Sequence, residues 1–335
     1  MGVLVTGGAG FIGSWVSKAL LEQGEEVILI DDFNDFNYKS TLKDDRIRIL
    51  LNESKYRRKK RYHSSDKKLW IYHADIRDEK KLRDIAKQHK IEKICHLGAR
   101  AGVRRSLQYP KVYYDVNIFG TLNVFQLAVQ QKIPSLVYAS SSSVYGGVKE
   151  LPFKETMKID NPLSPYAATK KAGEEMAAVF HNLYGINMTG LRFFTVYGPW
   201  GRPDMALYEF TEKIIAGKPI PVYNQGDMQR DFTYVTDIVQ GVIKALEKPY
   251  PYEIFNLGNA RTEKLSTFIA CIEKELGKKA EKILLPLQPG DVPKTSADIS
   301  KARKLLGYQP RTTIEQGIAA FVEWYKEYHK IKDAR

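Results

Sequence analysis

The chain has 335 residues, 43% of them hydrophobic, with a formal net charge of +13 and only two cysteines. This length allows a large core and is somewhat long for one domain, which favours a main domain with a smaller companion. No apolar run is long enough to span a bilayer, and the six histidines show no metal-ligand spacing. We also expect no signal peptide before the first strand. We therefore expect a cytoplasmic protein with reduced thiols at Cys95 and Cys271, no membrane anchor and no structural metal.

The N-terminus is typical of a strand that runs into a glycine-rich turn. Residues 3–13 are Val-Leu-Val-Thr-Gly-Gly-Ala-Gly-Phe-Ile-Gly, and a helix is predicted from Ser14 to Gln23. The glycines permit a tight turn and a close approach of the backbone to a pyrophosphate, while the helix N-terminus favours the anion. A glycine triplet alone is weak evidence, but its place between a strand and a helix predicts a dinucleotide-binding turn at Gly7, Gly10, Phe11, Ile12 and Gly13.

The second predicted strand, Glu26–Ile30, ends at two aspartates. Asp31 follows Gly13 by 18 residues and is placed to accept hydrogen bonds from a ribose diol. Its carboxylate would repel a 2′-phosphate, and no arginine follows it before Arg46. We therefore predict NAD rather than NADP as the cofactor.

Residues 52–68 form a strongly basic segment that resembles an insertion. Eight basic residues lie between Lys55 and Lys68. Such a block can bind nucleic acid or an acidic membrane surface. No nucleic-acid-binding motif accompanies it, so we expect a solvated loop before the strand at Leu69–Tyr72, with neither a nucleic acid nor a membrane as partner.

Strands and helices alternate along the first 198 residues. Strands are expected at 2–6, 26–31, 69–73, 93–97, 134–140 and 187–194, and helices at 12–23, 79–89, 112–131 and 165–184. This alternation predicts an α/β fold with a Rossmann-type, doubly wound parallel sheet.

After Gly198 the pattern loosens, with amphipathic helices at Met205–Ala216 and Ile314–Tyr328, whereas residues 231–260 return to the first domain. We predict an NAD-binding domain of residues 1–198 plus 231–261 and a smaller, interleaved α/β substrate domain of residues 199–230 plus 262–335.

Two segments carry the clearest chemical signal, the serine run Ala139–Gly146 and the stretch Ser164–Lys170. Tyr166 and Lys170 lie one helical turn apart, so the ammonium can stabilise a phenolate whose ordinary pKa is about 10. The same spacing occurs elsewhere in the chain, but only Tyr166 opens a strong helical pattern after a serine and a proline. The simpler alternative is an interfacial tyrosine; beside a dinucleotide fold we predict that Tyr166 takes a proton from a sugar hydroxyl.

The glycine spacing and the Tyr166–Lys170 pair make the chain resemble the extended short-chain dehydrogenase/reductases that modify nucleotide sugars. The resemblance covers nearly the whole length, and Leu191–Ala206 is most similar to one branch, the UDP-glucuronate 4-epimerases. It implies that Ser141 is a catalytic hydroxyl beside Tyr166. It also implies cofactor contacts at Asn34, Asp75, Ile76, Leu97, Ala99 and Asn117. The chain departs from the branch at Gly98, where alanine is usual.

The resemblance further implies a UDP-sugar substrate. The residues expected to hold its diphosphate and ribose are Arg202, Arg230 and Asp291, with Tyr223 packing on uracil. Gln288 stands where many relatives have arginine. The alternative is that Arg202 and Arg230 are surface ion-pair residues.

The implied reaction inverts C4 of UDP-glucuronate to give UDP-galacturonate through a transient 4-ketone. Ser142, Ser143 and Thr195 stand where the resembling epimerases grip the C6 carboxylate, although serines at a strand end often bond backbone groups instead. Dehydratases of the superfamily have an Asp-Glu pair, and UDP-glucuronate decarboxylases a glutamate, where this chain has Ser142 and Ser143. Without these acids, epimerisation is the simplest chemistry.

Two alternatives remain open at this point. One is a 4-epimerase for neutral UDP-glucose and UDP-galactose, although those enzymes usually have asparagine at the position of Thr195. The other is a catalytically silent dinucleotide-binding scaffold, or an RNA-binding protein that uses the basic segment. The intact Ser141, Tyr166 and Lys170 argue against a silent protein.

The predicted helices 112–131 and 165–184 carry apolar residues on more than one face, for example Phe119 and Leu183. One face of each helix should pack on the sheet and the remainder against a second subunit. Members of the resembling family pair through these helices, so we expect a homodimer; the alternative is a monomer with two thickly buried helices.

Overall fold

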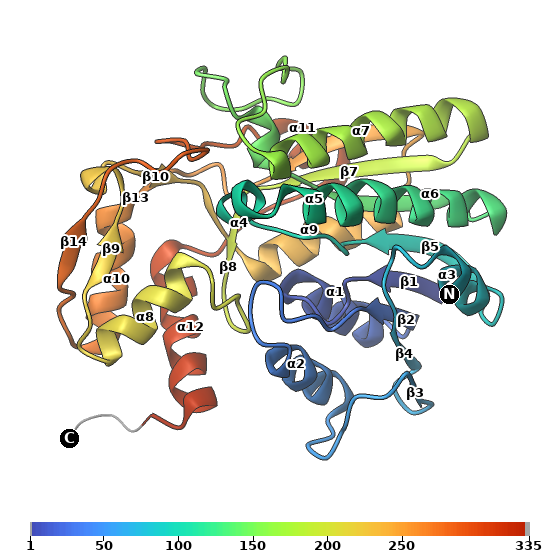
Figure 1. Ribbon diagram of the computed structural model, residues 1–335, viewed down its shortest axis with the longest axis horizontal. Helices are drawn as coiled ribbons and strands as arrows, with labels where there is room; N and C mark the ends of the chain where they lie inside the picture. The colour runs from blue at the N-terminus through green and yellow to red at the C-terminus, as the bar shows by residue number, and fades with distance from the viewer. Residues whose placement is uncertain (1, 332–335) are drawn as a thin grey trace.

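A computed structural model describes residues 2–331; residue 1 and residues 332–335, at the outer ends of the two predicted domains, lie outside the described part. Its centre is an eight-stranded sheet in the order β12-β7-β6-β5-β1-β2-β4-β3 (Figure 1). The strands are β1 (Gly2–Thr6), β2 (Glu26–Asp31), β3 (Arg61–Ser64), β4 (Leu69–His73), β5 (Ile91–His96), β6 (Ser135–Ser141), β7 (Asn187–Phe193) and β12 (Tyr252–Leu257). Neighbours pair in parallel except β3, which is antiparallel to β4. The predicted doubly wound α/β fold is confirmed.

Helices cover both faces of the sheet and enclose a separate apolar core on each (Figure 1). One face holds α1 (Phe11–Glu22), α2 (Thr41–Leu51), α9 (Val235–Glu247) and α11 (Ser300–Leu306). The other holds α3 (Glu79–Ala86), α5 (Pro110–Tyr114), a π-helical turn (Asp115–Gly120), α6 (Thr121–Gln130) and α7 (Pro165–Tyr184). The short helix α4 (Val103–Gln108) lies between β5 and α5.

The six strands and four helices expected before residue 198 are present, and one helix is subdivided. The predicted helix 112–131 consists of the end of α5, the π-helical turn and α6. Four further helices and strands, α2, α4, β3 and β8 (Thr195–Tyr197), were not predicted.

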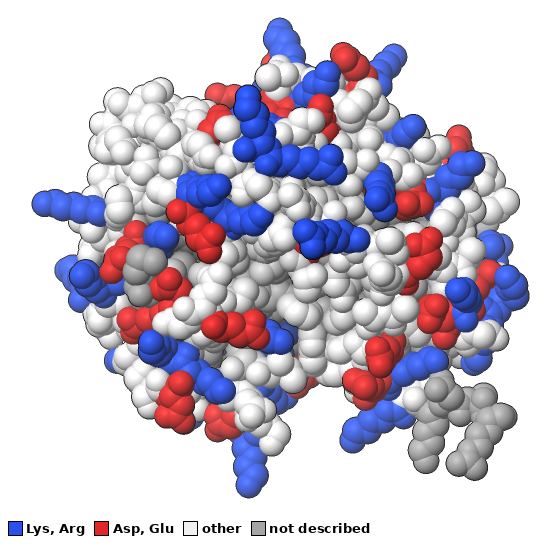
Figure 2. All heavy atoms as spheres, turned by 180° about the vertical axis from the view of Figure 1, so that it is seen from behind, with Lys and Arg blue, Asp and Glu red and all other residues white. Residues whose placement is uncertain are grey.

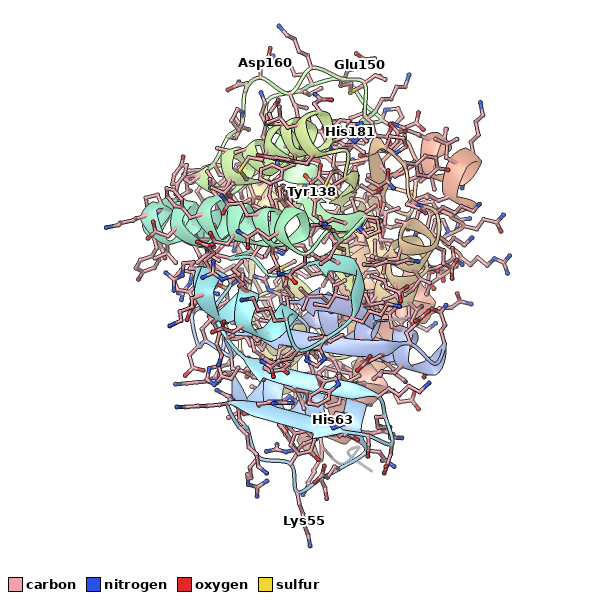
Figure 3. All side chains as sticks on the ribbon, turned by 90° about the vertical axis from the view of Figure 1, so that its right-hand side faces the viewer. Lys55, His63, Tyr138, Glu150, Asp160 and His181 are labelled. Carbon is pink, nitrogen blue, oxygen red and sulfur yellow. The ribbon has the colours of Figure 1, made fainter. Side chains whose placement is uncertain are left out.

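The basic segment 52–68 is more structured than the solvated loop that we expected. Its residues 61–64 form β3, one of the two edge strands of the sheet. The guanidinium of Arg58 pairs with Asp44 at 2.6 Å, so this cation is not free to bind a partner. Lys55 lies at the tip of the loop and points away from the sheet (Figure 3). On the face seen in Figure 2, basic and acidic side chains are interspersed, without one extended basic surface.

A second region with its own aromatic core lies beside the carboxyl ends of the strands (Figure 1). It contains α8 (Ala206–Ile215), β9 (Ile220–Val222), a 3-10 turn (Asn224–Gly226), β10 (Gln229–Arg230), β13 (Glu263–Lys264), α10 (Leu265–Leu276), β14 (Lys282–Leu284) and α12 (Ile314–His329). Stacked Phe232 and Phe268, with centroids 4.3 Å apart, lie in its core. Two short strands, β8 (Thr195–Tyr197) and β11 (Phe232–Tyr234), pair in parallel, and α9 and β12 then return the chain to the sheet. Within residues 2–331, no helix has the length and apolar character needed to cross a bilayer.

Candidate active site

A cavity of about 730 Å³ opens beside the carboxyl ends of the central strands. The segments after β1, β2, β5 and β6 line one part of it, and β8, β9 and β10 line another. Ligands of doubly wound sheets bind where the strand order reverses, which in this sheet is between β1 and β5. The cavity is therefore where a dinucleotide is expected.

The turn between β1 and α1 leaves no room for side chains at its glycines. Gly7 has a φ of +67°, in the left-handed region that favours glycine. A Cβ atom at Gly13 would lie 2.1 Å from the carbonyl oxygen of Gly7, and one at Gly7 would lie 2.8 Å from the backbone of Gly98. This packing brings the N-terminus of α1 against the cavity, an arrangement that fits a pyrophosphate.

Asp31 lines the cavity at the end of β2 but is only 5% exposed. Its carboxylate accepts hydrogen bonds from the main-chain nitrogens of Ala9 at 3.2 Å and Phe33 at 2.8 Å, and from Lys43 Nζ at 2.8 Å. A carboxylate offers about four acceptor positions, so Asp31 retains capacity for a ribose hydroxyl.

The neighbouring Asp32 pairs with two cations that the sequence argument overlooked. Arg100 Nη2 lies 2.8 Å and Lys43 Nζ 3.5 Å from its carboxylate. Burial alone would raise the pKa of Asp32, but the charges of Arg100 and Lys43 lower it to about 2. Two carboxylates therefore balance two cations here, and the region offers no net positive charge to a 2′-phosphate.

Two of the predicted cofactor contacts face elsewhere. Asn117 is 2% exposed and lies outside the cavity lining. Its amide oxygen accepts from Arg100 N at 2.7 Å, and its amide nitrogen donates to Arg100 O and Thr169 Oγ1, both at 3.0 Å. Asn117 thus supports the segment after β5. The Asp75 carboxylate pairs with Arg77 at 2.6 Å, also outside the lining. The remaining predicted cofactor residues, Asn34, Ile76, Leu97 and Ala99, line the cavity.

Tyr166 enters the cavity from the first turn of α7. The helix begins there because Ser164 Oγ accepts a hydrogen bond from Ala167 N at 3.1 Å and Pro165 occupies the first helical position. Ser141, at the end of β6, lies close enough to Tyr166 for its hydroxyl to lower the pKa of the phenol. Ser141 and Tyr166, 25 positions apart in the sequence, thus lie in the same cavity.

Lys170 lies one turn further along α7. Its Nζ atom donates to the carbonyl of Ala139 at 2.8 Å and lies 6.0 Å from the ring centroid of Tyr166. Burial lowers the pKa of Lys170 to about 8, against the opposing effect of Glu174. Burial also raises the pKa of Tyr166, whereas the neighbouring Ser141 hydroxyl and the charge of Arg202 lower it. Further positive charge in the cavity would favour the phenolate.

A buried ion pair between Arg192 and Glu174 lies next to Lys170 and Ser141 in the structure. Arg192 on β7 contacts both carboxylate oxygens of Glu174, at 2.8 and 2.7 Å, and Glu174 Oε1 also accepts from Ser140 Oγ at 2.6 Å. Glu174 lies one turn after Lys170, and Ser140 directly precedes Ser141. The ion pair therefore fixes α7 against β6 and β7 at the site.

All the residues predicted to contact the UDP-sugar line this cavity, namely Ser142, Ser143, Thr195, Arg202, Tyr223, Arg230 and Asp291. They divide into two groups. Arg202 pairs with Asp204 and lies close enough to Tyr166 for its charge to lower that residue's pKa. Arg230 instead pairs with Asp291 at 3.8 Å and donates to the carbonyl of Pro293 at 3.0 Å. Arg202 is thus associated with Tyr166, and Arg230 with Asp291.

The hydroxyls of Ser142, Ser143 and Thr195 are available to a ligand. Within the part of the chain that the structure describes, none of these three hydroxyls forms a hydrogen bond. At this strand end, Ser141 Oγ instead accepts the backbone hydrogen bond, from Ser143 N at 3.2 Å. All three border the cavity that holds Tyr166. These three hydroxyls are uncharged hydrogen-bond donors on the lining of the cavity.

A model of the NAD dependent epimerase/dehydratase family matches residues 3–258. The chain belongs to this family. It is 44% identical to the UDP-glucuronate 4-epimerase of Thermodesulfobacterium geofontis over 97% of this chain and 96% of that protein. It is 50% identical to an uncharacterised protein of Methanocaldococcus jannaschii over 97% and 96%.

Among solved structures, the chain is similar to UDP-glucuronic acid 4-epimerase from Bacillus cereus in complex with UDP-glucuronic acid and NAD. The TM-score is 0.88 at 34% identity, with 98% of this chain and 100% of that chain covered. The resemblance inferred from the motifs is confirmed.

Sequence reasoning missed several cavity residues because their partners are distant in the chain. Lys43 and Arg100 meet at Asp32, and Arg104 on α4 reaches Tyr223 and Asp291. Lys43 could have been suspected as a cation 12 residues after Asp31. The sequence around Arg104 contains no local signal for its role.

Proposed function

We propose that this protein is an NAD-dependent epimerase that inverts C4 of UDP-glucuronate to give UDP-galacturonate through a transient 4-keto sugar. The observation that carries this proposal is one cavity in which Ser141 and Lys170 flank Tyr166 while serines occupy the two positions after Ser141. The relatives named above support the same substrate and cofactor.

The residues that fit the cofactor are the glycine-rich turn, Asp31 and the segment after β5. NAD, when bound, supplies a hydride acceptor and donor beside the reacting carbon. Tyr166 takes the proton from the 4-hydroxyl and returns it after the keto sugar has turned over. Ser141 holds the same oxygen, and the positive charge of Lys170 favours the phenolate form of Tyr166.

The remaining roles follow from position in the cavity. We assign the uronate carboxylate to Ser142, Ser143 and Thr195, the sugar end to Arg202, and the nucleotide to Arg230, Asp291 and Tyr223. We further assign NAD binding to residues 1–198 with 231–261, and UDP-sugar binding to residues 199–230 with 262–335.

We also propose a cytoplasmic homodimer that uses neither nucleic acid nor a membrane. Both cysteines are free, although Cys271 is only partly buried. Large apolar side chains of the π-helical turn and α7 are exposed, including Phe119 at 60% and Leu183 at 68%. Such residues on adjacent helices fit a contact with a second copy.

The experiment that tests the activity is separate incubation with UDP-glucuronate, UDP-glucose and UDP-xylose, with detection of C4 epimers by chromatography. UDP-glucuronate should give UDP-galacturonate at the highest rate. Conversion of the neutral sugars alone would contradict the proposal, and no conversion of any sugar by NAD-loaded protein would favour a silent scaffold.

A further inference from the structure

Four side chains converge at one part of the cavity wall, from three separate segments of the chain. We call Arg104, Tyr223, Arg230 and Asp291 the nucleotide cluster. The guanidinium carbon of Arg104 lies 4.4 Å from the ring centroid of Tyr223, and its Nη2 atom lies 3.7 Å from the carboxylate of Asp291. Arg230 approaches the same carboxylate at 3.8 Å. One carboxylate thus lies between two guanidinium groups.

The nucleotide cluster has one more positive charge than negative charge. Its two arginines face a single acid, and both Asp291 contacts are longer than a typical charge-assisted hydrogen bond of about 2.7–2.9 Å. Burial lowers the pKa of Arg230, Asp291 raises it and the charge of Arg104 lowers it. The two arginines therefore repel each other, and an anion bound between them would relieve that repulsion.

Gln288 lies three residues before Asp291, outside the cavity lining, and carries no charge. It stands where many members of the resembling family have arginine, and its Oε1 atom is buried without a hydrogen-bond partner within residues 2–331. A neutral amide cannot balance the charge of a diphosphate.

The loop that follows Gln288 packs directly against α4. Gly290 has a φ of +79°, and a Cβ atom there would lie 3.0 Å from Val103 Cγ1. Val103 directly precedes Arg104 in the sequence. The packing therefore brings a cation from α4 to the loop that lacks one.

We propose that Arg104 is a substrate-binding residue that contacts the diphosphate of the UDP-sugar and supplies the charge that Gln288 does not. This inference rests on the proposed function, because it requires a UDP-sugar. The long contact to Asp291 leaves the donors of Arg104 free to turn toward phosphate oxygens. Asp291 is then released to accept hydrogen bonds from the ribose.

A contact with uracil through Tyr223 is the competing role for Arg104, and ligand truncation separates the two. Calorimetry of the NAD-loaded protein with UDP, UMP and uridine gives three affinities for each variant. Arg104→Met should weaken UDP binding by roughly 10- to 100-fold, as expected for one or two charge-assisted hydrogen bonds. Uridine binding should change by less than about threefold. The matched control is Lys111→Met, an exposed cation on α5 outside the cavity lining, which should leave all three affinities unchanged.

A compensating substitution tests the link with Gln288. Adding Gln288→Arg to Arg104→Met should restore at least about tenfold of the lost UDP affinity, because the longer, cationic side chain would extend toward the nucleotide cluster from the neighbouring loop. Failure of this rescue would overturn the claim that Arg104 replaces a missing arginine.

Two other results would overturn the assignment itself. If Arg104→Met binds UDP as tightly as the wild type, or loses uridine and UDP equally, Arg104 does not serve the diphosphate. If the wild-type protein binds UDP no better than uridine, the proposed function and this inference both fail, and this outcome is recognisable without any variant.

Discussion

Arg46 on α2 donates to the main-chain carbonyl of Trp200, from Nη2 at 2.6 Å and from Nε at 3.2 Å. The same guanidinium donates to the carbonyl of Ala9 in the glycine-rich turn at 3.1 Å, and Arg46 is only 2% exposed. Arg46 therefore joins the predicted pyrophosphate turn to the segment that leads to Arg202.

Replacement of this residue by an apolar one should be strongly destabilising. Arg46→Met leaves the buried carbonyls of Ala9 and Trp200 without a donor, at a cost of about 1–3 kcal/mol for each group. We expect the free energy of unfolding in urea to fall by about 2–5 kcal/mol. Arg83→Met, which removes an exposed i,i+4 pair with Glu79, is the control and should change it by less than about 0.5 kcal/mol. Similar losses in the two variants would contradict the role of Arg46.

Removal of the Tyr166 hydroxyl should abolish proton transfer while leaving ligand binding intact. Tyr166→Phe keeps the ring and its edge contact with Tyr113, whose centroid is 6.2 Å away. Turnover of UDP-glucuronate should fall by about two to four orders of magnitude, as for other positioned acid–base groups. Dissociation constants for UDP and NAD should stay within about threefold. A variant that keeps most of its activity would remove Tyr166 from the mechanism.

Loss of the Lys170 charge should move the pH dependence of the reaction. The ammonium favours the phenolate of Tyr166, so Lys170→Met raises the pKa of that phenol and shifts the rising limb of kcat to higher pH, by about one unit or more. Because burial lowers the pKa of Lys170 to about 8, the wild-type enzyme loses this support as the pH rises through 8. The pH profile of kcat from 6 to 10 checks both points, and an unchanged rising limb would contradict them.

The exposed apolar side chains of the π-helical turn and α7 should mediate dimer formation. Leu183→Glu places a charge at the most exposed of these large apolar residues and should give a monomer by light scattering at micromolar concentration. Ile283→Glu changes a side chain of 49% exposure on β14, in the other region, and is the control. A monomeric wild-type protein, or a dimer that tolerates Leu183→Glu, would contradict the proposal.

The parts of the site that could be predicted are those specified by short sequence spacings. Tyr166 and Lys170 share one helix face, and the glycines share one turn. α2 was missed because Lys43 and Arg46 occupy its buried face, where they contact Asp31 and main-chain carbonyls. Charged residues at buried positions interrupt the apolar periodicity that identifies a helix.

Residues that act through distant partners could not be predicted from spacing. Asn117 was assigned to the cofactor, yet its amide is occupied by Arg100 and Thr169. β3 was missed because an edge strand with only one neighbour needs little apolar character, and its sequence, Arg-Tyr-His-Ser, reads as part of the basic segment. Both outcomes depend on tertiary pairing that no local pattern contains.

The last prediction concerns the carboxylate of the uronic acid. Oxidation at C4 makes a β-keto acid, because the ketone and the C6 carboxylate both flank C5. Such an acid loses carbon dioxide readily when the bond to its carboxylate aligns with the carbonyl π-system. An epimerase must therefore hold the carboxylate so that this bond stays out of alignment. The hydroxyls of Ser142, Ser143 and Thr195 border the same cavity as Tyr166 and are neutral, so they can hold the carboxylate without a strong ion pair.

Alanine at each of these three positions should weaken turnover of the acid sugar by about 1.5–3 kcal/mol in transition-state stabilisation, the usual range for a hydrogen bond to a charged group. The rate on UDP-glucose, which has no carboxylate, should change far less. Loss of the hydrogen bonds to the carboxylate should also lead to decarboxylation and release of a UDP-pentose, which chromatography of the products would detect. Ser65→Ala, in the exposed turn after β3, is a control that should alter neither rate nor products. Equal wild-type rates on acid and neutral sugars, or unaltered kinetics in Thr195→Ala and both serine variants, would show that the carboxylate is held elsewhere.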